Sequence, residues 1–305
     1  PHLGRLGGDP VMSGHNRAPF VPFPSRKAWH WPNGARLAVW VVVNVEAWDF
    51  ERVGGVTLNA PSTAPPDVPN YTWREYGSRI GIWRTFEILE RVGIPGTVTL
   101  NAGVCDAYPN IVRAILTREW EIMGHMYTND VSLNGLGEAE ERELIDRTLK
   151  RITQDTGFRL RPRGWLGSGL AESARTLDIL AQNDIEYVGD WVNDEQPYLL
   201  QTATKPIVAM PYSLEINDIG IFLRRGFTGP EYEEMLRDQF DVLYEESART
   251  AKVMCIALHP FITGVPFRAK HLEAALTYMK RQEHAWFARG SEIVNAWREA
   301  TGGEM

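Results

Sequence analysis

Residues 37–45 form a near-continuous run of apolar residues in which Asn44 is the polar interruption. Such a run, rich in β-branched side chains, is typical of a strand buried on both faces, as in a parallel sheet covered by helices. Glu46 follows the run, and in parallel α/β folds ligands bind at the carboxyl ends of the strands. This stretch alone supports two interpretations of Glu46 equally, a general base in a site and the first residue of a solvated loop.

The rest of the chain alternates between short apolar runs and segments whose apolar residues recur at helical spacing. Residues 51–70 are rich in Pro, Gly and Thr, and a loop of this length in a compact domain is usually functional. Helices are predicted at residues 71–92, 109–118, 138–156, 171–183, 231–247, 266–281 and 291–300, and further strands at residues 96–100, 121–125, 187–191, 206–210, 252–258 and 285–288. The alternation predicts an α/β fold, a distorted (β/α) barrel of about seven parallel strands.

The composition is that of an ordinary globular protein, because 44% of the 305 residues are hydrophobic and 23% are charged. The formal net charge of -7 argues against nucleic acid or an anionic membrane as a partner. Cys105 and Cys255 each follow an apolar stretch and are expected to be buried free thiols. No apolar run approaches the roughly 20 residues of a membrane span. We therefore expect a cytoplasmic protein.

The first residues of the chain differ in character from the rest. Residues 1–11 are rich in glycine, lack the apolar core of a secretory signal, and precede the sequence Met12-Ser13-Gly14. We interpret residues 1–11 as an expression-vector remnant. The prediction is then a single catalytic domain that spans residues 12–305.

Four predicted strands, or the loops directly after them, present a side chain that is suited to acid–base chemistry: Glu46, His125, Asp190 and His259. One histidine at the end of a strand is more often structural than catalytic. Two histidines and two acids at the same end of successive strands predict an active site, although they do not name a reaction.

The segments around these residues resemble the five motifs of the polysaccharide deacetylase superfamily, and most closely its branch of cytoplasmic allantoinases and cyclic imide hydrolases. The resemblance covers the chain from about residue 20 to residue 297. In this family the first motif supplies adjacent catalytic and metal-binding carboxylates, and the matching residues here are Glu46 and Ala47. The second motif carries two histidines four residues apart, and here those positions hold His125 and Asn129.

The other three motifs imply roles for further residues. Residues 161–165 are similar to the third motif, whose arginine braces the base and whose backbone amides can face an oxyanion. The segment that begins at Asp190 resembles the fourth motif, whose aspartate orients a histidine. His259 matches the histidine of the fifth motif, which acts as the general acid. The resemblance therefore implies that Arg161, or alternatively Arg163, holds the base and that Asp190 orients His259.

Two stretches favour the cyclic-amide branch over the sugar deacetylases. Residues 210–218 and 164–169 resemble substrate-side signatures of that branch. Each is weak alone, and the two together in this order are fairly specific. Asn217 and Asp218 could also simply cap a turn.

The departures from the family pattern concern the metal site. A divalent ion would need a carboxylate and two imidazoles, whereas only His125 keeps a ligand position, and the neutral carbonyl of Asn129 is a poor zinc ligand. We expect no cofactor; if zinc or manganese did bind, Glu46, His125 and Asn129 would be its ligands. Hydrolysis without metal suits a cyclic imide, whose carbonyl is activated by a second acyl group, better than an acetamide, which would depend far more on a Lewis acid.

The resemblance thus implies hydrolysis of a ring C–N amide bond in a small cyclic imide or ureide. Glu46 would take a proton from water, and His259 would protonate the departing nitrogen. His125 and Asn129 would donate hydrogen bonds to the water or to the substrate carbonyl. Backbone amides around residues 164–165 would contact the oxyanion, and tryptophans would wall the pocket. The expected substrate-binding residues are Asn44, Trp48, Asn129, Gly164, Trp165, Trp191 and Asn217.

Two other functions stay open. A metal-dependent de-N-acetylase of an amino sugar or polysaccharide would need a bound ion and an open groove. A catalytically dead relative that binds a small molecule is disfavoured, because Glu46, Arg161, Asp190 and His259 are retained together. Relatives in the family suggest a homo-oligomer, either a dimer or a tetramer.

Overall fold

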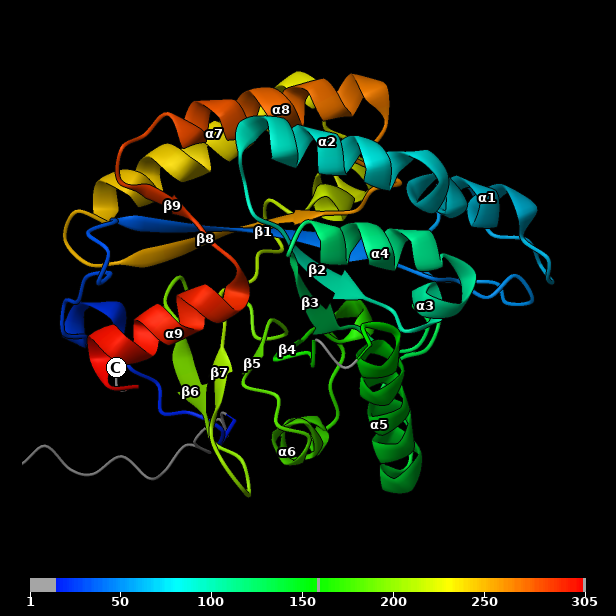
Figure 1. Cartoon of the computed structure of the whole chain (residues 1–305), viewed down its shortest axis with the longest axis horizontal. Coiled ribbons are helices and arrows are strands. Elements are labelled where there is room, and N and C mark those ends of the chain that lie inside the picture. The colour runs from blue at the N-terminus through cyan, green and yellow to red at the C-terminus, as the bar shows by residue number, and fades with distance from the viewer. Residues whose placement is uncertain (1–14, 158–159, 304–305) are drawn as a thin grey trace, which may run out of the picture.

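The computed structural model describes residues 15–157 and 160–303, which form one mostly parallel sheet with helices packed against it (Figure 1). Its strands are β1 (Leu37–Val45), β2 (Thr97–Leu100), β3 (Glu121–Gly124), β4 (Gly164–Trp165), β5 (Tyr187–Val188), β6 (Tyr198–Leu200), β7 (Ile207–Ala209), β8 (Lys252–Leu258) and β9 (Ala285–Phe287). The strands pair in the order β6-β7-β5-β4-β3-β2-β1-β8, and β9 pairs with the first residues of β1. The pairing is parallel except between β6 and β7.

Helices cover the sheet. The α-helices are α1 (Val68–Tyr76), α2 (Ile82–Val92), α3 (Gly103–Ala107), α4 (Pro109–Thr117), α5 (Glu138–Asp155), α6 (Thr176–Gln182), α7 (Gly229–Glu246), α8 (Pro266–Lys280) and α9 (Gly290–Thr301). Shorter helical turns are η1 (Phe23–Ser25), η2 (Gly77–Gly81), η3 (Ser168–Leu170) and η4 (Ile219–Arg224). Helices α2, α8 and α7 lie side by side over β1 and β8 (Figure 1).

Strand β1 is the centre of the core, and its side chains alternate between the two faces of the sheet. The odd-numbered residues of β1 belong to an apolar cluster with helices α2, α7 and α8. Even-numbered residues such as Trp40 belong to a second cluster, which includes Trp297 of α9. Asn44 continues the even series, and its side chain donates a hydrogen bond to Tyr212, which belongs to the second cluster.

The predicted helix at residues 71–92 is one helical segment, in which the π-helical turn η2 joins α1 to α2. This turn packs on the backbone that follows β8. A Cβ atom on Gly81 would lie 2.0 Å from the carbonyl oxygen of Pro260, and one on Gly77 would lie 2.8 Å from the amide nitrogen of Phe261. Only glycine permits this approach, and π-helical turns inside α-helices are frequent near functional sites.

The predicted α/β fold with a barrel-like parallel sheet is confirmed, and the structure adds two differences. Within the described residues β6 and β8 are not paired with each other, so the barrel is open there; Glu195, before β6, accepts a hydrogen bond from Val253 of β8. The sheet also ends in the antiparallel strand β6, which the sequence pattern did not indicate. The predicted helix at residues 171–183 begins only at Thr176, because the Ser173 and Thr176 hydroxyls bind the buried Glu141 carboxylate.

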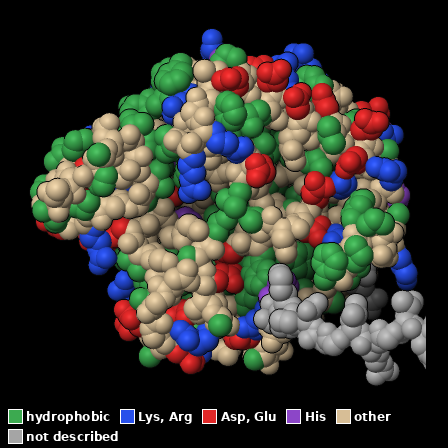
Figure 2. Space-filling model, turned by 180° about the vertical axis from the view of Figure 1, so that it is seen from behind, with side chains coloured by type: hydrophobic (Ala, Val, Ile, Leu, Met, Phe, Trp, Pro, Cys, Tyr) green, Lys and Arg blue, Asp and Glu red, His purple; other side chains and the backbone are tan. Residues whose placement is uncertain are grey.

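The remaining expectations concern the first residues of the chain, the two cysteines and membrane-spanning helices. Residues 1–11 lie outside the described residues, so their interpretation as a vector remnant stays a prediction. Cys105 and Cys255 are buried and free, as expected. None of the helices in the described part of the chain is both long and apolar enough to cross a membrane. On the face shown in Figure 2 acidic and basic side chains are interspersed.

Candidate active site

The polar residues that follow β1, β3 and β8 emerge at the same edge of the sheet, because the parallel register aligns these strands. The last residues of β1, β2 and β3 are paired across the sheet, so Glu46 and His125 each follow an aligned position. The last residue of β8 is aligned with Val43, which places His259 level with Asn44. Three of the four strand-end residues predicted from the sequence are thereby brought together.

The Glu46 carboxylate faces both histidines. Its Oε1 atom lies 3.8 Å from Nε2 of His125 and 3.6 Å from Nε2 of His259. Only 3% of the Glu46 side chain is exposed, and its other oxygen, Oε2, has no hydrogen-bond partner within the described residues. A buried carboxylate between two imidazoles can exchange protons with small molecules that reach this edge of the sheet.

The tautomer of His125 follows from its contacts. Its Nδ1 atom lies 2.6 Å from the carbonyl oxygen of Leu166, which can only accept, so Nδ1 carries a proton. In the neutral imidazole Nε2 is then an acceptor. His125 Nε2 can therefore accept a hydrogen bond, whereas the sequence led us to expect a donor.

Asp218, not Asp190, orients His259. The Asp218 carboxylate accepts hydrogen bonds from Nδ1 of His259 at 2.6 Å, from the His259 amide at 2.6 Å, and from the Thr263 hydroxyl. Burial alone would lower the pKa of His259, but the charge and hydrogen bond of Asp218, together with Glu46, raise this pKa above its ordinary value of 6.5. The predicted pairing of His259 with Asp190 is thus wrong, and Asp218 supports the imidazolium.

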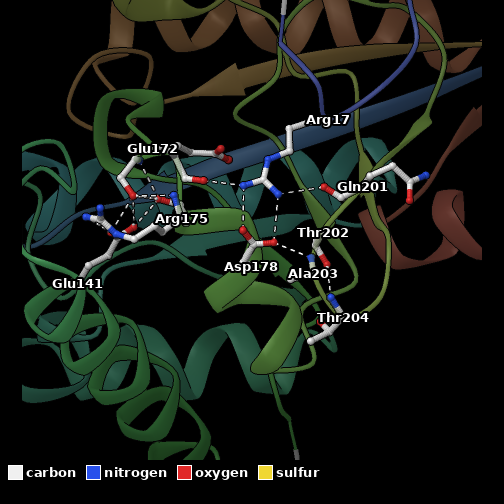
Figure 3. Close-up of polar contacts among 12 residues, drawn as sticks. Arg17, Glu141, Glu172, Arg175, Asp178, Gln201, Thr202, Ala203 and Thr204 are labelled. Carbon is white, nitrogen blue, oxygen red and sulfur yellow. Dashed lines mark hydrogen bonds and ion pairs between the residues drawn. The ribbon is translucent and has the colours of Figure 1, made fainter.

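Asp190 instead lies on the wall of the same cleft and accepts a hydrogen bond from the Gly167 amide at 2.8 Å. Burial and the neighbouring Glu172 raise the pKa of Asp190 well above its usual range, and burial raises the pKa of Glu172 to about 7. Each of these two carboxyl groups therefore binds a proton more readily than a free carboxylate does. Glu172 also accepts a hydrogen bond from Trp191, and it lies beside the Arg17–Asp178 ion pair (Figure 3).

Neither Arg161 nor Arg163 approaches Glu46. Arg161 is exposed and pairs with Asp184, while Arg163 pairs with Glu186. The reason is the direction of the strand: both arginines precede β4, so they lie at the amino edge of the sheet, whereas Glu46 follows β1 at the carboxyl edge.

The cation beside Glu46 is Arg74 of α1, which the sequence reasoning missed. Only 3% of Arg74 is exposed, and it lines a small cavity together with Glu46. Its Nη1 atom donates to the carbonyl oxygen of Gly54 at 2.7 Å, and its guanidinium lies 4.1 Å from the ring centre of Trp48. Burial lowers the pKa of Arg74 below its ordinary value, and the charge of Glu46 opposes this shift. An arginine remains charged under such conditions.

Asn101 is a second missed residue. It follows β2, and its side-chain oxygen accepts a hydrogen bond from the Ala47 amide at 2.9 Å while its amide group donates to the carbonyl oxygen of His125. It thus ties the turn after β1 to the turn after β3. The rule that drew attention to Glu46, a polar residue directly after an apolar strand, would also have found Asn101.

A cleft of about 430 Å³ opens over these groups. Asn44 and Asn217 line it, as predicted, and both donate to the Tyr212 hydroxyl. The Asn217 side-chain oxygen also accepts from the Ile219 amide, so Asn217 caps a turn as well. The polar side chains of the lining are those of Asn44, Glu46, His125, Asp190, Tyr212, Asn217, Arg224 and His259.

The other expected substrate contacts lie outside the residues that line this cleft. Trp165 is fully buried in the core, and Gly164 packs against the ring of Tyr187. Trp48 lies under Arg74, and Trp191 is hydrogen-bonded to Glu172. Asn129 donates its backbone amide to Ala47 at 2.9 Å. The β4 segment reaches the cleft one residue later, at Leu166, whose side chain lines the cleft and whose carbonyl holds His125.

The donor set does not fit the metal site of the deacetylase family. Ala47 has no donor atom and packs in the apolar core, and only His125 keeps a family ligand position. Within residues 15–157 and 160–303 no three His, Cys, Asp or Glu side chains are grouped to hold a metal ion.

Comparison with known proteins identifies relatives along most of the chain. No protein-family model matches. A crystal structure of a probable polysaccharide deacetylase from Pseudomonas aeruginosa PAO1 is 31% identical, covers 88% of this chain and 93% of its own, and gives a TM-score of 0.81. The crystal structure of Puue allantoinase is 29% identical, covers 96% of this chain and 100% of its own, and gives a TM-score of 0.86. A Schizosaccharomyces pombe protein whose name assigns it to the polysaccharide deacetylases is 28% identical over 295 residues, 88% of this chain and 92% of its own.

Asp218→Asn should reduce kcat and move the alkaline limb of its pH profile to lower pH. Asp218 raises the pKa of His259, so without this charge the imidazolium loses its proton at lower pH. Asp190→Asn is the matched control: Asp190 does not contact His259, so this variant should leave the limb in place. A limb that moves in Asp190→Asn and not in Asp218→Asn would contradict the assignment.

Proposed function

The chain belongs to the polysaccharide deacetylase superfamily, and we propose that it hydrolyses a ring C–N amide bond in a small cyclic imide or ureide by acid–base catalysis without a metal. The family and the allantoinase neighbour support hydrolysis of a C–N bond in general. The main support for the finer assignment is the Glu46 carboxylate between two imidazoles, next to Ala47 in the position of the family's metal-binding carboxylate.

The first step is attack by water. Glu46 takes a proton from the water through Oε1, and the Nε2 acceptor of His125 holds the second hydrogen, so the oxygen is directed at the ring carbonyl. Arg74 keeps a positive charge beside the Glu46 carboxylate and compensates part of the cost of burying it.

The second step is collapse of the tetrahedral intermediate. The C–N bond breaks and the ring nitrogen receives the Nε2 proton of His259, whose imidazolium is stabilised by Asp218. Because Glu46 Oε1 and His259 Nε2 are only 3.6 Å apart, the proton taken from water can return to His259 directly. One water is consumed, this transfer returns both groups to their starting protonation states, and the product carboxylic acid releases its own proton to solvent.

The absence of a fitting metal donor set agrees with a cyclic imide as substrate. In an imide the second acyl group withdraws electrons from the carbonyl and stabilises the departing nitrogen, so less stabilisation has to come from a Lewis acid. A cleft of about 430 Å³ is within the range of about 300–1,000 Å³ that holds small molecules. We also propose that the protein acts without cofactor, as a cytoplasmic homo-oligomer, and binds neither nucleic acid nor membrane.

A substrate panel tests the proposal most directly. Purified protein is incubated with succinimide, hydantoin, allantoin, N-acetylglucosamine and chitin oligomers, and ring opening or acetate release is followed. We expect turnover of at least one cyclic compound and no release of acetate. Acetate release without ring opening would favour the de-N-acetylase, and no turnover of any compound would favour a catalytically dead binding protein.

Glu46→Gln should lower kcat by about 10²–10⁴-fold with little change in substrate affinity, because the variant keeps the shape and loses the proton acceptor. The matched control is Glu121→Gln at the amino end of β3, where burial raises the pKa of a carboxyl group far from the cleft. Near-native kcat in Glu46→Gln would show that Glu46 is not the base.

Exhaustive chelation should leave kcat within a factor of about two, whereas loss of a true Lewis acid forfeits several kcal/mol of transition-state stabilisation. A zinc-dependent amidase treated in parallel shows that the chelation is complete. Loss of activity that zinc or manganese restores would reject the metal-free mechanism.

A further inference from the structure

The Tyr212 hydroxyl is held in an unusual way at the wall of the cleft. Tyr212 is 5% exposed and lines the cleft together with Glu46, His125 and His259. Its oxygen accepts a hydrogen bond from Nδ2 of Asn44 at 3.2 Å and another from Nδ2 of Asn217 at 3.4 Å.

Both amide groups have their orientation set by backbone partners. Nδ2 of Asn44 also donates to the carbonyl oxygen of Leu258 at 3.2 Å, and that oxygen can only accept. The side-chain oxygen of Asn217 accepts from the Ile219 amide at 2.9 Å, and that N–H can only donate. The Tyr212 oxygen is therefore the acceptor in both contacts.

The hydroxyl proton of Tyr212 is consequently directed at neither asparagine. No acceptor for it occurs within the described residues, although a buried hydroxyl normally finds one. Burial raises the pKa of Tyr212 well above its usual range, so the group keeps this proton. A neutral, fixed donor thus lies on the cleft wall in reach of a ligand.

We infer that Tyr212 is a catalytic residue that donates its hydroxyl proton in a hydrogen bond to the substrate's carbonyl oxygen and to the oxyanion that forms when water adds. The inference deepens the proposed function and rests on it for the amide substrate.

The geometry suits this role in two respects. Glu46 and His125 hold water on the strand-end side of the cleft, and the two asparagines fix the phenol oxygen in advance, so little reorganisation is needed as charge develops. A preorganised donor of this kind supplies part of the stabilisation that a Lewis acid gives in metal-dependent amide hydrolysis.

The test is Tyr212→Phe, measured on whichever compound of the substrate panel the wild-type protein hydrolyses. Loss of one oxyanion donor should lower kcat by about 10²–10³-fold and change KM much less, because the hydrogen bond to the developing oxyanion is stronger than the one to the neutral carbonyl oxygen. Tyr232→Phe is the matched control: Tyr232 is a fully buried tyrosine whose hydroxyl has no partner among the described residues, and it does not line the cleft. Its kcat should stay near the wild-type value.

Replacing the substrate's carbonyl oxygen with sulfur distinguishes hydrogen-bond donation by Tyr212 from a structural effect of the mutation. The attacked carbonyl is replaced by a thiocarbonyl, which accepts hydrogen bonds weakly, and the ratio of the two rates is measured in each protein. The wild-type protein should discriminate strongly against sulfur and Tyr212→Phe much less. Partial unfolding of the variant lowers both rates equally, so it does not change the ratio.

The outcomes distinguish this inference from the proposed function. If an amide is hydrolysed and Tyr212→Phe keeps near-native kcat or an unchanged oxygen-to-sulfur ratio, Tyr212 is not the donor and the proposed function stands. If only acetylated sugars are hydrolysed, the cyclic substrate is rejected, and the same variant still decides the role of Tyr212. If no compound is hydrolysed, both proposals fall.

Discussion

A carboxylate buried at the end of an apolar strand is the constraint on which the rest of the site depends. An isolated buried charge costs several kcal/mol, so Glu46 requires neighbours that compensate it. The parallel register of β1 with β8, and through β2 with β3, provides His259 and His125, and helix α1 provides Arg74. These groups also make the carboxylate chemically useful, because each can hold or move a proton or fix a charge beside it.

Much of the fold and part of the site follow from local patterns. The alternation of β1 and the position of polar residues directly after apolar strands correctly place Glu46, His125 and His259 together. Residues that directly follow parallel strands lie at the same edge of the sheet. The same rule explains one error: Arg161 precedes a strand, and residues before a parallel strand lie at the other edge. Asp218 could not be found this way, because it precedes the helical turn η4 and follows no strand.

Arg74 was not predicted as a site residue for a different reason. A charged residue in a helix is ordinarily solvated, and helical periodicity contains no sign that this position is 3% exposed. The burial comes from the loop of residues 48–59, whose carbonyl groups at Gly54 and Val56 accept hydrogen bonds from the guanidinium. The long Pro- and Gly-rich loop thus holds a residue of the candidate site, through backbone contacts that no sequence motif records.

His259 pairs with Asp218 and not with Asp190 as predicted, and this difference changes the charge on the wall of the cleft. Burial and the neighbouring Glu172 raise the pKa of Asp190 well above its usual range, so Asp190 presents less negative charge to the cleft than a free carboxylate. Asp218, in contrast, is fully buried behind His259 and accepts three hydrogen bonds. Its charge raises the pKa of His259 from behind the imidazole, and Glu46 is the carboxylate in the cleft that faces the two imidazoles. This separation favours an imidazolium at His259 while the cleft accommodates a developing oxyanion, because a second charged carboxylate beside the substrate would repel it.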